Sequence, residues 1–278
     1  MPDFFRPATV DEALADLGRD RAVALAGGTQ VAMPMTAGLV DVDALVWLGC
    51  IDELRGIAVD RDRMTIGAGV TLFELASSSE IKRLHPALAE AAAGIGNPRV
   101  RAAATIGGHL AHADPRQDLP PLLMVLGAVV LIAGHDGNRR VPLTEFFTGF
   151  MSTALEPGEL LTGVELPAAP QNRRAGYVRF APVSASDYAA VGVAGAVTVR
   201  DGNVVEATLA LGAGSSTARV VPAAGFALLG RPGDAEIARA SQAIEAAADP
   251  VADQRGSIAY KRAMAGLWTR RLIQRLLA

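Results

Sequence analysis

With 278 residues, half of them apolar and one fifth charged, the chain is long enough to bury two or three hydrophobic cores and too apolar to be disordered. Its formal net charge of −3 at pH 7 excludes the basic surface that nucleic-acid-binding proteins present. Its single cysteine, Cys50, excludes an internal disulfide and an iron–sulfur cluster built by this chain alone. Because Cys50 ends the apolar run LVWLGC, we expect a buried, inert thiol.

Membrane and targeting segments are not expected. The uncharged apolar stretches fall short of the ~20 residues that cross a bilayer. The start, MPDFFRPATVDEAL, has neither the basic region nor the apolar core of a secretory signal. These features predict a cytoplasmic protein without a membrane span.

The first 57 residues predict a small unit of helix and strand. Thr9 and Glu12 have the spacing of a capping box, so a short helix is expected to begin there. Two apolar runs of strand length follow, at residues 22–26 and 44–49. The first run stops at a glycine pair, Gly27–Gly28.

Residues 58–172 predict a larger unit. A hairpin is expected to turn at residues 60–63, and a second capping box, Thr71 with Glu74, begins a helical stretch. Further helices are predicted at residues 86–95 and 119–126 and strands at 128–134 and 139–143, and the runs TEFFTGF and GELLTGVELP close this unit. The polar, proline-containing run 168–176 predicts a linker.

The last part of the chain, residues 173–278, changes character. Three antiparallel strands are predicted, at residues 176–183, 189–200 and 204–214. A long helix is expected at the end, with apolar residues at helical spacing: Met264, Leu267, Trp268, Leu272 and Leu276. Its opposite face is cationic: Lys261, Arg262, Arg270 and Arg275. Such a helix packs its apolar face on its own sheet or, in the alternative, on a partner.

Reactive side chains concentrate in residues 104–123, ATIGGHLAHADPRQDLPPLL. His109, His112 and Asp114 resemble a metal-binding set, but the preceding glycines and Pro115 predict no helix that would hold them in register. His85 and His135 lie in surface-like segments. We therefore expect no metal site. The motifs of a serine hydrolase, a P-loop and a Rossmann dinucleotide site are also missing from the sequence.

Two glycine pairs are predicted to follow strands, in LAGGTQ (residues 25–30) and TIGGH (residues 105–109). Without Cβ atoms, successive backbone N–H groups can converge on an anion at close range. The hydroxyls of Thr29 and Thr105 can add donors. Two such loops without a basic neighbour indicate a diphosphate held by backbone amides, and therefore a dinucleotide, whose identity these residues leave open.

Three stretches together resemble the FAD-binding medium subunit of the molybdenum hydroxylases, the family of xanthine dehydrogenase, aldehyde oxidase and aerobic carbon monoxide dehydrogenase. They are LAGGTQVAMPM at residues 25–35, IGAGVTLFEL at 66–75 and GNPRVRAAATIGGHLAHADPRQDLPPLL at 96–123. LALGAGSSTARV and AYKRAMAGLWTRRL resemble the companion C-terminal domain of that family. The resemblance therefore covers nearly the whole chain.

The resemblance implies an α+β protein with an FAD-binding fold of the vanillyl-alcohol-oxidase type. It implies two α/β subdomains, residues 1–57 and 58–172, the second with a mixed sheet. A three-stranded antiparallel sheet with helices would follow, at residues 173–278. FAD would lie between the first two units, bound without a covalent link, with its diphosphate at both glycine pairs.

The resemblance also implies the residues that bind FAD. They are Ala24, Leu25, Ala26, Gly27, Gly28, Thr29, Gln30, Val31, Ile95, Thr105, Ile106, Gly107, Gly108, His109, Asp118, Leu161 and Arg179. Ile95 would lie near the flavin ring or the adenine, and Asp118 would bind an FAD hydroxyl or position the loop. His109 stands where the family usually has Asn, so the side-chain contact of that position changes. No residue is expected to act as a catalytic acid or base.

The function that the resemblance implies is electron transfer within a heterotrimer. A large molybdopterin subunit would hydroxylate the substrate, and a small subunit with [2Fe–2S] clusters would deliver the electrons to FAD. NAD, oxygen or another acceptor would then receive them. Two alternatives stay open: a stand-alone FAD-dependent oxidase or dehydrogenase of the same fold, and a flavin-free binding module.

Overall fold

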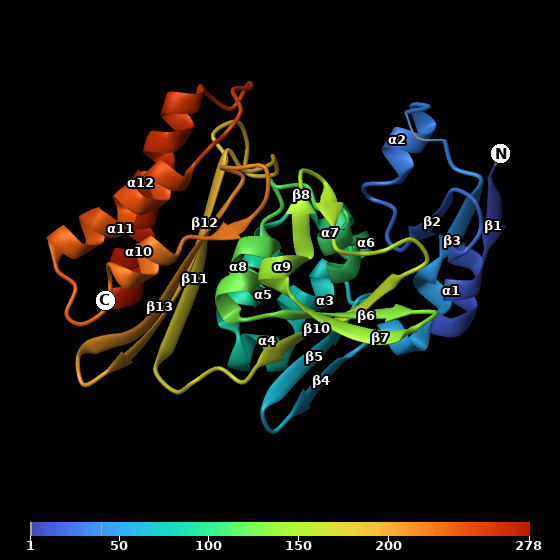
Figure 1. The fold of residues 1–278 in the computed structure, drawn as a ribbon, viewed down its shortest axis with the longest axis horizontal. Helices are drawn as coiled ribbons and strands as arrows, with labels where there is room; N and C mark the ends of the chain where they lie inside the picture. The colour runs from blue at the N-terminus through green and yellow to red at the C-terminus, as the bar shows by residue number, and fades with distance from the viewer. Residues whose placement is uncertain (1, 40) are drawn as a thin grey trace.

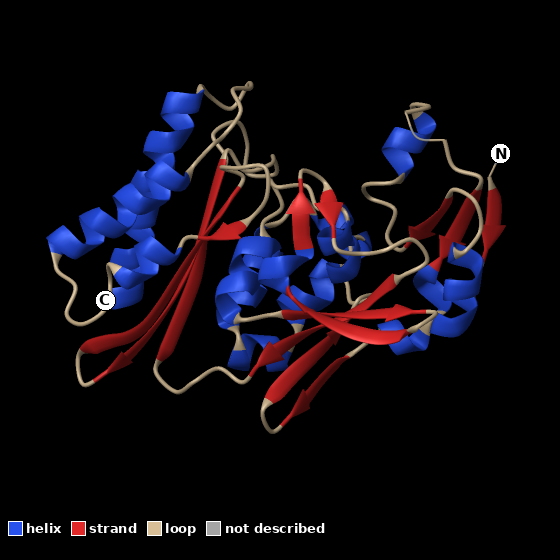
Figure 2. Cartoon of the chain, viewed as in Figure 1, coloured by secondary structure: helices blue, strands red, loops and turns tan. Residues whose placement is uncertain are grey.

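The computed structural model describes residues 2–39 and 41–278. These residues form three larger sheets, which follow one another along the longest axis of the molecule, and one two-stranded sheet (Figure 1, Figure 2). Each larger sheet takes its strands from one continuous part of the sequence. We propose that these sheets mark three units with the boundaries expected from the sequence, residues 1–57, 58–172 and 173–278. The first boundary falls within β4 (Ile57–Asp60), directly after its first residue.

The first unit is a small parallel sheet with a helix beside it. Its helices and strands are β1 (Asp3–Phe5), α1 (Val10–Leu17), β2 (Ala22–Leu25), α2 (Ala32–Thr36) and β3 (Ala44–Trp47), followed by 3₁₀ turns at Leu48–Cys50 and Asp52–Leu54. The central strand β3 pairs in parallel with β1 and with β2. The Thr9 hydroxyl accepts the Glu12 backbone N–H at 3.2 Å and caps α1, as the sequence predicts.

The second unit contains most of the short helices. Its elements are β4 (Ile57–Asp60), β5 (Arg63–Gly67), α3 (Leu72–Ser77), α4 (Ser79–Leu84), α5 (Pro86–Gly94), α6 (Pro98–Ala103), α7 (Ile106–Ala111), α8 (Leu119–Leu126), β6 (Val129–Gly134), β7 (Gly137–Pro142), α9 (Leu143–Phe146), β8 (Phe147–Gly149), β9 (Ser152–Thr153) and β10 (Leu160–Pro167). The sheet order is β4-β5-β10-β6-β7. Every neighbouring pair in it is antiparallel, so the expectation of a mixed sheet is wrong. Tight turns make β4–β5 and β6–β7 antiparallel hairpins, and β10 inserts antiparallel to both.

The third unit is a sheet covered by helices. Its elements are β11 (Arg173–Phe180), β12 (Val191–Arg200), β13 (Asn203–Gly212), β14 (Arg219–Val220), α10 (Pro222–Phe226), α11 (Asp234–Ala247) and α12 (Ile258–Leu277). The antiparallel sheet has four strands in the order β11-β12-β13-β14, whereas three were expected. The fourth strand, β14, has only two residues and is too short to give a strand pattern in the sequence.

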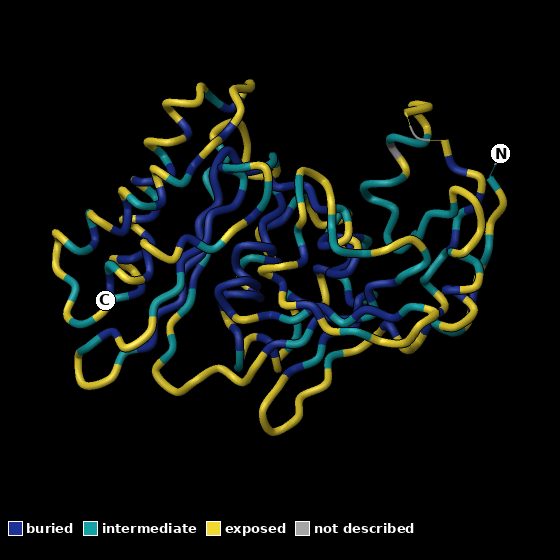
Figure 3. The backbone as a smooth tube through the Cα atoms, viewed as in Figure 1, coloured by how far each residue is buried: buried dark blue, intermediate teal, exposed yellow. Residues whose placement is uncertain are grey.

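The hydrophobic core joins the second and third units. Every residue of α8 is buried, and this helix packs on β12 and β13 of the third unit (Figure 3). The approach is close, because a Cβ added to Gly212 would lie 2.8 Å from the Pro121 ring. On the other side of the sheet, α12 packs on β11 and β12. The third unit is therefore fixed to the helix that follows the second glycine pair.

The buried face of α12 differs from the predicted one. Leu272 and Leu276 are buried as expected, but Leu267 is exposed, and Lys261 is buried with its ammonium on Asp253 at 2.7 Å. A Cβ on Gly266 would lie 2.8 Å from the Glu245 carboxylate, so small residues face α11. Close approach of the two helices, rather than the bulkiest apolar residues, sets the rotation of α12.

Two further expectations from the sequence are wrong. Cys50 is exposed, because it lies in a 3₁₀ turn beyond the end of the buried strand β3. His85 is only 4% exposed, because it lies between α4 and α5, where the two helices meet. Within the described residues, the structure has no helix long and apolar enough to cross a membrane.

Candidate functional site

Two cavities meet at the two glycine pairs. Cavity 1 has a volume of about 750 Å³ and cavity 2 of about 450 Å³. Seven residues line both cavities: Ala24, Ala26 and Gly27 around the first glycine pair, Thr105, Gly108 and Ala111 around the second, and Glu159. The cavities are therefore contiguous, and together they can hold one elongated ligand with a bulky group at each end.

The first glycine pair follows β2 and leaves the cavity-lining backbone unpaired. Gly28 has φ +69°, a left-handed conformation that favours glycine. An added Cβ on Gly27 would lie 1.8 Å from the Ala103 carbonyl oxygen, so the loop lies directly on the end of α6. No described residue accepts a hydrogen bond from the backbone amides of residues 27–31. These five consecutive N–H groups belong to residues that line cavity 1, which makes the loop a candidate anion site.

The second glycine pair does not follow a strand, and its amides are already used. Thr105 caps α7, which contains both glycines, and its hydroxyl accepts the Gly108 N–H at 3.1 Å. The amides of Ile106 and Gly107 donate to backbone carbonyls beside β5, each at 2.9 Å. The expectation of a loop here is wrong, because the Thr105 cap and these tertiary hydrogen bonds stabilise a helix that glycine disfavours by itself.

Side chains of the segment after α7 form one wall of cavity 1. Tyr177 on β11 donates its hydroxyl to Asp118 at 2.7 Å, and the Arg179 guanidinium lies 3.8 Å from the other Asp118 oxygen. Burial nevertheless raises the pKa of Asp118 to about 6. Burial and the neighbouring carboxylate also hold the pKa of Tyr177 well above its usual value of 10. The hydroxyl proton therefore stays on Tyr177 at neutral pH.

Two histidines lie beside cavity 1, one within α7 and one at the end of that helix. His109 is 6% exposed, and its Nε2 accepts the Leu119 backbone N–H at 3.4 Å. Burial lowers the pKa of His109 to about 3, so the ring is neutral at physiological pH. Burial also lowers the pKa of the half-buried His112. Contrary to the expectation, α7 holds His109 in a helix, and His112 follows at its end.

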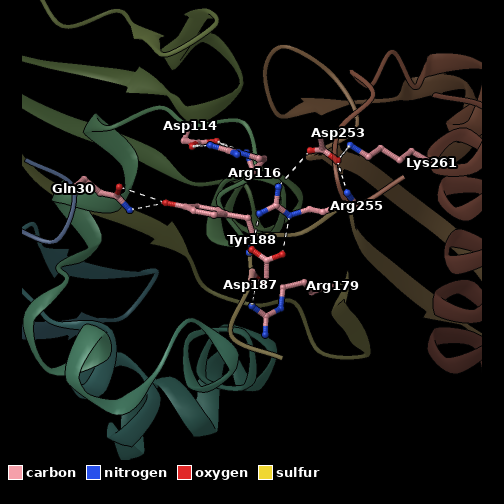
Figure 4. Close-up of polar contacts among 9 residues, drawn as sticks. All are labelled: Gln30, Asp114, Arg116, Arg179, Asp187, Tyr188, Asp253, Arg255 and Lys261. Carbon is pink, nitrogen blue, oxygen red and sulfur yellow. Dashed lines mark hydrogen bonds and ion pairs between the residues drawn. The ribbon is translucent and has the colours of Figure 1, made fainter. Parts of the chain in front are cut away.

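A polar network joins the third unit to the first glycine loop (Figure 4). The Tyr188 hydroxyl lies 3.0 Å from the Gln30 amide nitrogen, which donates to it. The Arg116 guanidinium stacks 4.5 Å from the centre of the Tyr188 ring. Asp187 pairs with Arg255 at 2.5 Å. Cavity 1 is thus completed by residues from three separate parts of the chain.

Cavity 2 has a different wall. Its lining is mostly apolar and comes from the first two units, with Trp47 from β3 and Leu161 from β10 among its residues. The Arg6 guanidinium lies 4.9 Å from the centre of the Trp47 ring. Gly49 packs so closely on the indole that an added Cβ would lie 2.4 Å from it. The indole is therefore held in place at the cavity wall.

The structure brings together most of the residues expected from the sequence. All of them line one or both cavities except Leu25 and Ile106. Ile106 is fully buried in α7, and Leu25 lies within β2, paired with β3. Among the described residues, no three His, Cys, Asp or Glu side chains are grouped so that they could hold a metal ion.

Sequence reasoning missed many of the cavity residues, among them four with large or charged side chains: Trp47, Arg116, Glu159 and Tyr188. Trp47 and Tyr188 carry a weak signal, since large aromatic residues are only 5% of this chain. Arg116 and Glu159 carry none, because polar residues in turns are common. Each of the four reaches its cavity through contacts that the local sequence does not encode.

Two family descriptions match the chain: "FAD binding domain in molybdopterin dehydrogenase" over residues 2–169, and "CO dehydrogenase flavoprotein C-terminal domain" over residues 176–276. The carbon monoxide dehydrogenase medium chain of Afipia carboxidovorans is 33% identical over 277 residues, covering 98% of this chain and 96% of the relative. The solved carbon monoxide dehydrogenase of Hydrogenophaga pseudoflava is similar with a TM-score of 0.96 at 34% identity, covering 98% and 96% of the two chains. Quinoline 2-oxidoreductase of Pseudomonas putida 86 gives a TM-score of 0.94 at 30% identity, covering 100% and 97%.

Proposed function

The chain belongs to the FAD-binding medium subunits of the molybdenum hydroxylases, and we propose that it takes electrons from an iron–sulfur partner and delivers them, through FAD, to NAD, oxygen or another acceptor. FAD, when bound, supplies a group that exchanges electrons one or two at a time. The chain's own residues bind it, orient it and limit the access of water. The molybdenum cofactor and the iron–sulfur clusters belong to the partner subunits.

The observation that carries this proposal is the row of five amides at residues 27–31, which line cavity 1, have no partner among the described residues, and begin at Gly27, which borders both cavities. A dinucleotide needs a site for two negatively charged phosphates flanked by spaces for two ring systems. Residues 27–31 supply N–H donors that begin at the junction and continue along cavity 1, where the phosphates would lie. These backbone dipoles would stabilise the negative charge of the diphosphate in a cavity that Arg116 and Arg179 also line.

We propose that the isoalloxazine occupies cavity 1 and the adenine cavity 2. The three-ring isoalloxazine is the larger group, and cavity 1 is the larger space. Arg179 lines cavity 1, and its positive charge favours an electron-rich ring beside it. The apolar wall of cavity 2, with Trp47 and Leu161, suits a flat neutral base.

The proposal can be tested by ligand competition on the full chain, alone and in the complex with which it co-purifies. One FAD should bind per chain, ADP should compete because it fills the junction and cavity 2, and FMN should bind far more weakly because it lacks the adenosine. Equal binding of FMN and FAD would contradict the two-cavity placement. A colourless protein that takes up no FAD in either form would overturn the function itself.

The partners decide between this function and a stand-alone oxidase. Co-purification of a small iron–sulfur chain and a large molybdopterin chain is expected, and a screen of NAD, oxygen and artificial acceptors with the purified complex would identify the acceptor. We propose the cytoplasm as the place of action, since an exposed free thiol such as Cys50 is typical of a reducing compartment. Substrate turnover by the isolated chain would contradict the proposal that a partner subunit carries out the substrate reaction.

A further inference from the structure

His109 occupies the position where the family pattern usually has Asn. It lines cavity 1, and its ring contacts the start of α8. We propose that the Nδ1–H of His109 donates a hydrogen bond to an oxygen of bound FAD, and that α8 fixes the tautomer that makes this possible. The inference rests on the proposed FAD site. It concerns a side-chain donor in a segment whose backbone amides are already paired.

The tautomer follows from the contact with α8. Leu119 is the first residue of α8, so its backbone N–H has no acceptor within the helix. This N–H donates to Nε2 of His109 at 3.4 Å. A ring nitrogen can accept only when it carries no proton, and a neutral imidazole has one proton. That proton is therefore on Nδ1.

The ring stays neutral because it is enclosed. His109 is 6% exposed, and burial lowers the pKa of its ring to about 3. The nearest ionisable groups act in opposite directions, His112 lowering this pKa further and Asp114 raising it. Near neutral pH, a single tautomer with a single donor faces whatever lies in cavity 1.

The Nδ1–H has no partner among the described residues, yet it is not sealed in the core. No described residue bonds to it. Both ring nitrogens of His85, by contrast, are enclosed by packed atoms without a partner. Because Nδ1 of His109 keeps accessible surface and the residue lines cavity 1, its donor is open to the cavity.

The neighbours of the ring indicate which oxygen of FAD would accept this hydrogen bond. Gly108 precedes His109 at the junction of the cavities, and Leu119, which holds the ring, follows Asp118 in cavity 1. Between these points, the bound dinucleotide would present diphosphate oxygens and the adjoining ribityl chain. The donor thus fits a phosphate or hydroxyl oxygen on the flavin side of the diphosphate.

Nitrogen NMR on the ¹⁵N-histidine-labelled full chain tests the tautomer and the contact directly. The chain has four histidines, so the signals can be assigned by single substitutions. His109 should show a protonated Nδ1 and an unprotonated Nε2, and FAD should shift the Nδ1 signal much more than the Nε2 signal. A proton on Nε2, or an Nδ1 signal that FAD leaves unchanged, would overturn the inference.

Substitutions measure what the donor contributes. His109→Leu should raise the Kd for FAD about 10-fold, as expected for one hydrogen bond to a charged acceptor, whereas His109→Asn should stay within about 3-fold because the amide can donate and accept. His135→Leu, at an exposed turn outside both cavities, is the matched control. A folded His109→Leu variant that binds FAD as the unmodified chain does would refute the inference, while an unmodified chain without FAD would refute the proposed function.

Discussion

Gly27–Gly28 and Gly107–Gly108 meet at the junction of the two cavities, but they contribute to it in different ways. The first pair opens a loop in which five consecutive amides have no protein partner among the described residues. The second pair lies in α7, where the amides of both glycines are bonded to protein oxygens. The first segment therefore offers backbone donors, and the second offers side chains, His109 and Asp118.

This difference shows that a glycine pair is not by itself an anion site. At Gly107 the missing Cβ makes room for Ala68, which an added Cβ would approach to 2.6 Å. At Gly28 the missing side chain permits a left-handed backbone that leaves its neighbours' amides free. The same residue type thus serves close packing in one segment and donor exposure in the other.

The largest expected effect tests the contact beneath the first loop. Gly27→Ala would place a Cβ 1.8 Å from the Ala103 carbonyl oxygen, and because both partners are backbone, the loop or α6 must move. We expect a loss of about 3 kcal/mol or more in the free energy of unfolding, together with loss of FAD binding. Urea unfolding and an FAD titration measure the two. Unchanged stability would show that the loop does not lie on α6.

A second prediction concerns Asp118, a side chain of the second segment, and the pH dependence of stability that it causes. Because the folded pKa is about 6 and the ordinary value is 3.8, the folded state keeps this proton at a pH where the unfolded chain has lost it. The resulting stability is complete below about pH 4 and is lost as the pH rises through about 6. The side chain of Asp118→Asn cannot ionise. When the pH is raised from 4 to 7, the free energy of unfolding of this variant should therefore fall by about 2–3 kcal/mol less than that of the unmodified chain.

Urea unfolding at several pH values measures this difference. Asp136→Asn, at the exposed turn between β6 and β7, is a control that should follow the unmodified chain. Parallel curves for the unmodified chain and Asp118→Asn would show that Asp118 is ionised in the folded protein at all these pH values.

A third prediction separates packing from ligand space within the second pair. A Cβ added to Gly108 would meet only the Thr105 hydroxyl, at 3.2 Å, and would otherwise extend into the junction. Gly108→Val should change stability by about 1 kcal/mol or less but raise the Kd for FAD at least 10-fold by steric exclusion. Gly107→Ala should instead lower the free energy of unfolding more than it weakens FAD binding. The same two measurements, urea unfolding and an FAD titration, compare the variants.

The smallest expected effect examines whether the ligand passes the junction into cavity 2. Trp47 lines that cavity, and Trp268, the other tryptophan, lies on α12 and lines neither cavity. In a Trp268→Phe background, FAD and ADP should both quench the Trp47 fluorescence, and Trp47→Leu should raise the Kd for ADP about 3-fold. Quenching by FAD but not by ADP would place the adenine elsewhere.

Local signals made much of the fold predictable. The helix at residues 119–126 and the capping box at Thr71 come from the sequence because proline, glycine and hydrogen-bonding caps act over a few residues. The helix at Ile106–Ala111 was not predictable, since its first amides bond to carbonyls near β5 rather than within the helix. The exposed Cys50 and the rotation of α12 also depend on neighbours that are distant in sequence.

The candidate site shows the same limit. Its two glycine segments were found because their residue types are constrained by the backbone. The wall made by Arg179 and Tyr188 could be anticipated only at Arg179, through the family resemblance. Packing of the third unit on α8 places these residues at cavity 1, and no pattern within the third unit points to a partner on the first.

The hydrogen bond between Gln30 and Tyr188 joins residues 158 positions apart. Synthesis proceeds from the N-terminus at roughly 5–20 residues per second, so the second half of this contact emerges from the ribosome many seconds after the first. Throughout that interval the nascent chain can fold its first two units and both glycine segments, but cavity 1 still lacks the wall that contains Tyr188. The protein can therefore enclose the cofactor only late in its synthesis. A chain truncated before Tyr188 would keep the walls of cavity 2 but leave cavity 1 open to solvent.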